Sequence, residues 1–134
     1  MSDDRRPFVV VLLGSALAVA GLVHLWLLPR YLPNEPVSAG LALIAGWASV
    51  TLLCYAIGRL QSAPRELPNM RFADIGIALL LLSLVIALAL DAVGLASEAA
   101  APIYALPALG IYAGVALIGW SIGRRTEAIN EIVR

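Results

Sequence analysis

The sequence predicts an all-α membrane protein in which four transmembrane helices form a compact antiparallel bundle. Four apolar stretches carry this prediction, at 8–28, 37–58, 73–95 and 103–123. Each is as long as the roughly 20 residues that cross a ~30 Å hydrocarbon core at about 1.5 Å per residue. Composition agrees, because 61% of the residues are hydrophobic and only 13% are charged. The 134 residues leave room for a single domain, 1–134, and for no separate soluble one.

The basic residues predict the orientation of this bundle. All of them are arginines, and only Arg30 falls in a connection on the far side from the two tails and the middle loop. Because short cytoplasmic loops carry an excess of positive charge, we expect both termini in the cytoplasm and the loops 29–36 and 96–102 outside, in a multi-pass protein of the plasma membrane. The expected inner-face anchors are Arg5, Arg6, Arg59, Arg124 and Arg125.

The N-terminus also allows an export-signal interpretation. Arg5-Arg6-Pro7-Phe8 resembles a twin-arginine core, and Ala18-Val19-Ala20 would suit a signal peptidase. The apolar run nevertheless continues past Ala20 to Leu28 without a polar break. We therefore expect residues 8–28 to remain as a true span.

Prolines suggest where the helices end. Three of them bracket the first outer loop and should stop both neighbouring helices: Pro29, Pro33 and Pro36. Pro107 lies inside the fourth predicted span, where it would bend the helix by removing one backbone hydrogen bond. The charged tail from Arg124 is expected to form a short amphipathic helix along the inner headgroups.

A partial internal repeat links the second and fourth spans. Residues 47–59 and 112–124 are identical at six of thirteen positions, with an offset of 65 residues. This pattern suggests two helical hairpins in tandem, related by a pseudo-twofold axis along the membrane normal. Chance similarity between apolar segments is the alternative, and the first and third spans do not align convincingly.

Small residues indicate the faces through which the helices pack, since lipid gives no hydrophobic drive for association. The glycines expected at helix contacts are Gly14, Gly21, Gly76, Gly110, Gly114, Gly119 and Gly123. They extend into stripes that also carry His24 on the first span and Asp91 on the third. These stripes should face the bundle interior, with one glycine face left over for a partner.

His24 and Asp91 are the two ionisable candidates inside the spans, where an unpaired charge costs several kcal/mol. Each lies about 6 Å below the predicted outer boundary by helical rise. A hydrogen bond or ion pair between them would create a proton- or cation-responsive site open to the outside. The alternative is that both groups reach the headgroups or bond to backbone carbonyls. Tyr112 lies near mid-membrane, where its phenol should make an interhelical hydrogen bond or line a small cavity.

Several chemistries lack the residues that they need. The single cysteine, Cys54, excludes an internal disulfide and paired-thiol oxidoreductase chemistry. The single histidine excludes bis-histidine haem, and no metal-ligand spacing is present, so we expect neither cofactor nor metal. A membrane enzyme would need several convergent polar groups, for which only His24, Asp91 and Glu98 are at hand.

The favoured interpretation is therefore a small non-enzymatic integral membrane protein that acts as a scaffold or accessory subunit. Its expected partners are the lipid bilayer and either further copies of itself or another membrane protein, with no nucleic acid. The alternative is a small homo-oligomeric transporter or channel that uses the level of His24 and Asp91 as its gate or coupling site.

Overall fold

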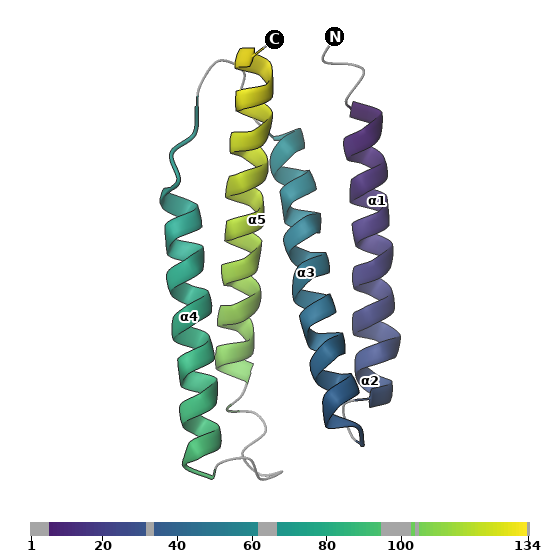
Figure 1. The fold of residues 1–134 in the computed structure, drawn as a ribbon, viewed down its shortest axis with the longest axis vertical. Helices are drawn as coiled ribbons and strands as arrows, with labels where there is room; N and C mark the ends of the chain where they lie inside the picture. The colour runs from purple at the N-terminus through teal and green to yellow at the C-terminus, as the bar shows by residue number, and fades with distance from the viewer. Residues whose placement is uncertain (1–5, 32–33, 62–66, 95–102, 104, 134) are drawn as a thin grey trace.

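The computed structural model describes residues 6–31, 34–61, 67–94, 103 and 105–133, and these form four helical rods (Figure 1). The first rod consists of α1 (Arg6–Leu22), a π-helical turn η2 (Val23–Leu27) and α2 (Leu28–Tyr31). The others are α3 (Pro36–Leu60), α4 (Arg71–Ala92) and α5 (Ala105–Val133). All four rods are long and apolar enough to cross a membrane. This confirms the prediction of an all-α chain with four helices of membrane-spanning length and hydrophobicity.

The rods pack side by side in the order α1, α3, α5, α4 (Figure 1). α3 and α5 lie at the centre and run in the same direction, whereas α1 and α4 run the opposite way at the two edges. This row is more open than the compact bundle that the sequence predicted. The reason is physical: lipid is as apolar as leucine, so helices in a membrane need not close around a hydrophobic core.

Glycines bring the two central helices into backbone contact. A Cβ added to Gly58 of α3 would overlap the carbonyl oxygen of Trp120 on α5. A Cβ added to Gly123 of α5 would overlap the carbonyl oxygen of Tyr55 on α3. The two contacts interchange under the 65-residue offset of the repeat, because Gly58 corresponds to Gly123 and Tyr55 to Trp120. The central pair is therefore locally two-fold symmetric.

The edge helices extend the same symmetry. α1 begins at Arg6 and α4 at Arg71, which are 65 residues apart. α1 packs against α3 as α4 packs against α5. The arrangement is that of two hairpins in tandem, and it supports the repeat hypothesis even where the sequences of the first and third spans do not align.

The first rod passes through a proline that was expected to end it. Pro29 lies inside α2, and helical structure continues to Tyr31. Just before it, the backbone widens into the π-helical turn, whose following residue Leu28 donates its N–H to the carbonyl of Val23. Pro29 has no N–H and therefore cannot complete the ordinary bonding pattern after this turn. The first outer connection is accordingly shorter than the predicted loop 29–36.

α5 differs from its predicted span at both ends. It begins at Ala105, so Pro107 occupies the first turn, where a missing N–H breaks no helical hydrogen bond. Pro107 therefore gives no reason for the bend that was expected there. At the other end, α5 continues to Val133 as one helix of 29 residues. At about 1.5 Å per residue it is ~43 Å long, so the tail prolongs the fourth rod instead of forming a separate helix.

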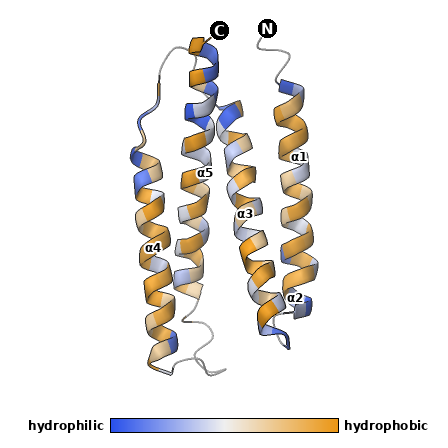
Figure 2. Cartoon of the chain, in the orientation of Figure 1, coloured by the Kyte–Doolittle hydropathy of each residue, from blue (hydrophilic) through white to orange (hydrophobic). Residues whose placement is uncertain are grey.

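Hydrophilic residues concentrate near both ends of the helices, and the middle of each helix is mostly apolar (Figure 2). Five described arginines belong to the end where α1 and α4 begin: Arg6, Arg59, Arg71, Arg124 and Arg125. Arg30 belongs to the opposite end. Arg5, the remaining expected anchor, lies outside the described residues. The charge asymmetry on which the predicted orientation depends is thus preserved in three dimensions.

Candidate functional site

His24 is the centre of the polar contacts inside the membrane-spanning part. It lies in the π-helical turn, and its Nδ1 is 2.7 Å from the carbonyl oxygen of Ala20. A carbonyl can only accept, so Nδ1 carries the proton and donates it. Nε2 is 2.6 Å from the hydroxyl oxygen of Tyr112 on α5. In the neutral ring Nε2 accepts, so the Tyr112 O–H donates to it.

Gly46 of α3 leaves room for this contact because it has no side chain. A Cβ there would lie 3.0 Å from Cε1 and 3.1 Å from Nε2 of His24. The imidazole therefore crosses α3 at the position where α3 has no side chain and reaches α5 beyond it. Gly46 is buried and His24 is half-buried, so the bond joins three helices at one level.

Tyr112 makes the interhelical hydrogen bond that its place near mid-membrane predicted. The residue that sequence reasoning missed is Gly46, whose role depends on a neighbour from a distant part of the chain. A signal was present, because Gly46 and Tyr112 lie about 20 Å and 18 Å from Arg59 and Arg124, respectively, by helical rise. Residues on adjacent helices can contact each other, or share a contacting neighbour, only if they lie at about the same depth.

Asp91 does not share this site. It is exposed in the last turn of α4, and α4 packs against α5 at the edge of the row opposite α1. The structure therefore gives His24 a different partner from the one that the sequence suggested. Placing both residues at one depth was insufficient, because the row keeps their helices apart.

The glycines fall into two groups, those at contacts between helices and those that face open space. Gly76 and Gly114 face each other where α4 meets α5, since a Cβ on Gly76 would lie 2.6 Å from the carbonyl oxygen of Gly114. A Cβ at each of three others would overlap an atom of a neighbouring helix: Gly110, Gly119 and Gly123. Gly14 and Gly21 of α1 have nothing within 4 Å of such a Cβ. Gly14 and Gly21 of the stripe expected to turn α1 inward thus face outward, whereas His24 of the same stripe points inward. Ala16 and Ala20 are the small residues of α1 that are buried.

An ion pair connects the two central helices near their C-terminal ends. Nε and Nη2 of Arg59 each lie 2.9 Å from Oε2 of Glu127. The side chains are only 7% and 14% exposed. Glu127 belongs to the part of α5 that extends beyond the predicted span. The extension therefore supplies the negative charge that stabilises a buried arginine on α3.

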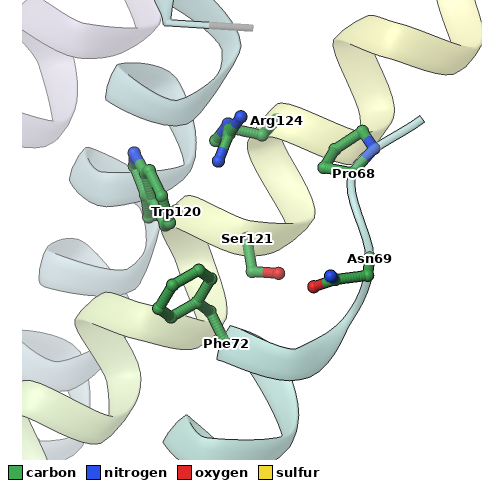
Figure 3. Close-up of a pocket in the computed structure, with 6 residues that line it drawn as sticks. All are labelled: Pro68, Asn69, Phe72, Trp120, Ser121 and Arg124. Carbon is green, nitrogen blue, oxygen red and sulfur yellow. The ribbon is translucent and has the colours of Figure 1, made fainter. Parts of the chain in front are cut away.

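Arg124, which corresponds to Arg59 in the repeat, shares one contact with it: the guanidinium carbon of Arg59 lies 5.9 Å from the ring centroid of Tyr55, the counterpart of Trp120. The guanidinium carbon of Arg124 lies 4.7 Å from the ring centroid of Trp120, within cation–π distance. Both residues line a pocket of about 170 Å³ between α5 and the start of α4 (Figure 3). Its remaining lining residues are Pro68, Asn69, Phe72 and Ser121. This pocket combines hydrogen-bonding groups with aromatic walls.

Within the described ranges, no group of three or more His, Cys, Asp or Glu side chains could hold a metal ion. Comparison of the chain with protein-family models, with curated proteins and with solved structures gives no match. The function is therefore argued from the geometry of this chain.

Proposed function

We propose that the protein is a non-enzymatic scaffold or accessory subunit of the plasma membrane, and that its α1 edge binds a transmembrane helix of another membrane protein. The supporting observation is the difference between the two edges of the row. Gly14 and Ala18 of α1 are exposed, and Gly21 has open space where a side chain would lie. Both edges expose large side chains, such as Leu17 on α1 and Leu81, Val85 and Leu88 on α4, but α4 has no exposed glycine.

Helix spacing places the three small residues on the side of α1 away from α3. Gly14 is two residues, or about 200° around the helix, from the buried Ala16, and Ala18 is two residues from both Ala16 and the buried Ala20. Small residues at intervals of three and four let a second backbone approach closely. Lipid gains nothing from such a surface, whereas a partner helix does. The chain uses the same device internally where Gly76 meets Gly114.

The two edges provide a matched experiment. A photo-crosslinking amino acid replaces Ala18 in one variant and Val85 in another, and each complex is purified in mild detergent and analysed by native mass spectrometry. We expect Ala18 to crosslink to one different membrane polypeptide at fixed stoichiometry, and Val85 to crosslink mainly to lipid. Gly14→Leu should abolish the Ala18 crosslink, and Ala78→Leu, on the exposed side of α4, should preserve it.

Three outcomes would overturn this proposal. One is a crosslink that survives Gly14→Leu, and another is equal labelling from both edges. The third is a crosslink only between two copies of this chain, which would favour the alternative below.

A homo-oligomeric transporter or channel is the second candidate, and the His24–Tyr112 hydrogen bond inside the apolar part of the row favours it. Ionisable groups at such depth commonly belong to ion or proton pathways. A single row of helices encloses no lumen, so a pathway would need a second copy to cover the level of His24. Native mass spectrometry separates the two candidates, because a transporter of this kind gives a homodimer or larger assembly without a foreign subunit.

A further inference from the structure

We propose that two copies of this chain associate through the C-terminal part of α5, where Ile122, Ile129 and Val133 of each copy form the contact. The last part of α5, residues 124–133, reaches past the described ends of the other three rods at the arginine-rich end of the row (Figure 1). Large aliphatic side chains on this extension are exposed, Ile129 at 43%, Ile132 at 59% and Val133 at 79%.

Exposure has a different meaning on this extension than on the rest of the row. Inside a bilayer, lipid covers an exposed leucine without cost, so such residues indicate no partner. By helical rise Ile129 lies ~8 Å and Val133 ~14 Å beyond Arg124, whereas one headgroup layer is roughly 5–7 Å thick. These side chains therefore face water, where a cluster of exposed aliphatic groups is typical of a protein contact.

The exposed residues belong to a stripe with the spacing of a coiled coil, which we call the α5 stripe. Ile122, Thr126, Ile129 and Val133 follow one another at intervals of four, three and four residues, within about 60° around the helix. The Thr126 hydroxyl donates to the carbonyl oxygen of Ile122 at 2.8 Å, so it brings no unpaired donor to an apolar contact. Ala128 is only 1% exposed, so the extension packs against its own chain on another side.

A second copy of this chain provides a matching surface for the α5 stripe. Within the described part of the chain, α5 is the only helix that reaches the level of Val133, so another α5 is the helix of equal reach (Figure 1). Two copies inserted in the same orientation have parallel α5 helices. A two-fold axis along the membrane normal then brings each stripe residue next to its counterpart.

The residues beside the α5 stripe permit this approach. Four residues border the stripe in a parallel pair, and none of them is acidic: Gly123, Arg125, Asn130 and Ile132. In that arrangement Arg125 of one copy faces Asn130 of the other, so like charges do not meet across the contact. The carboxylate of Glu127 lies off the stripe and pairs with Arg59 of its own chain.

The α5 stripe continues into the apolar part of the row. Ile122 and Gly119 line a groove of about 360 Å³ between α3 and α5. Ala48 and Leu52 are on its other wall. The groove gives room for side chains of the facing helix, so the contact can begin within the membrane and end in water.

Disulfide crosslinking in isolated membranes tests the contact. Cys54→Ser removes the single cysteine, and Ile129→Cys or Glu131→Cys then gives each copy one new thiol. A disulfide needs Cα atoms within about 7 Å of each other, so Ile129→Cys should yield a covalent dimer on mild oxidation. Glu131→Cys lies about 200° away around the same helix and should yield at most about a fifth as much.

Energy transfer between labelled copies in vesicles measures the strength of the association. Ile129→Ala should raise the dissociation constant about tenfold, equivalent to about 1.4 kcal/mol, because a symmetric contact loses the same side chain twice. Leu81→Ala is the matched control, since Leu81 is 57% exposed on α4 in the apolar part of the row. It should leave the dissociation constant unchanged, and equal weakening by both variants would overturn the proposal.

Three further results would contradict the proposal. Equal crosslinking by the two new thiols would show random collision between copies. Protection of the Ile129→Cys thiol from a water-soluble maleimide in protein diluted to monomers would place the α5 stripe among the headgroups. A crosslink from Ile129→Cys only to a different polypeptide would assign the stripe to another partner. The α1 edge is tested separately, because Ile129→Ala should leave the crosslink from Ala18 to its partner unchanged.

Discussion

The two hairpins of the row share one architecture but are held together differently. In the second hairpin, α4 and α5 approach until Gly76 and Gly114 lie backbone to backbone. In the first, α1 meets α3 through side chains, and His24 and Val23 of the π-helical turn fill the space over Gly46. The glycines of α1 take no part in this contact.

The difference shows how a repeated hairpin can be divided between two tasks. The second hairpin uses Gly76, Gly110 and Gly114 in its own internal contact, and its α4 exposes leucines on the outer face. The first is closed through the buried Ala16 and Ala20 of α1, so that Gly14 and Gly21 take no part in its internal contact. One half is thus closed on itself, and the other keeps a helix-packing surface available.

Adding a side chain to the backbone contact of the second hairpin should have the largest effect. We expect Gly114→Leu to lower the free energy of unfolding by about 3 kcal/mol or more, since the new Cβ would lie 2.7 Å from the carbonyl oxygen of Gly76. The measurement is an SDS titration of the purified protein, followed by circular dichroism.

Gly14→Leu is the matched control in the first hairpin. A Cβ at this position meets open space, so the same substitution should change the unfolding free energy of the isolated protein by less than about 0.5 kcal/mol. Equal losses at both positions would mean that α1 packs through its glycines after all, and the comparison between the hairpins would fail.

The ion pair between Arg59 and Glu127 provides a second matched test. Glu127→Gln leaves the buried guanidinium of Arg59 without its counter-charge, and we expect the free energy of unfolding to fall by about 2 kcal/mol. This is less than the roughly 3–5 kcal/mol for a fully buried pair, because this end of the helices meets water. Glu131→Gln, one turn further along α5, makes the same charge change and should cost under about 0.5 kcal/mol. Thermal unfolding in detergent measures both. Equal effects would show that the ion pair contributes nothing specific.

Sequence reasoning succeeded where length and composition decide the outcome, and failed where neighbours decide it. The four spans follow from apolar stretches long enough to cross a bilayer. The row does not follow, because lipid places no penalty on leaving a bundle open. Gly14 and Gly76 look alike in the sequence, yet one faces open space and the other a neighbouring backbone. Only the lateral order of the helices separates them.

The same limit explains the partner of His24. Helical rise gave the depth of His24 and of Asp91, and the small-residue stripes gave the helix face of each, but neither gives the lateral order of the helices. Tyr112 was expected to make an interhelical hydrogen bond, but nothing in the sequence named His24 as its partner or Gly46 as the residue that leaves room for the contact. A contact that crosses one helix to reach another has no periodic signature in any single stretch.

Double-mutant cycles provide the smallest but most specific test of the first hairpin. His24→Ala and Tyr112→Phe should be coupled by about 1 kcal/mol, within the range of roughly 0.6–1.7 found for hydrogen bonds between membrane helices. His24→Ala and Asp91→Asn should be additive, because the two residues lie on opposite edges of the row. Coupling to Asp91 without coupling to Tyr112 would restore the pair that the sequence suggested. It would require α1 and α4 to meet, which is possible only in a closed bundle or across a contact between two copies.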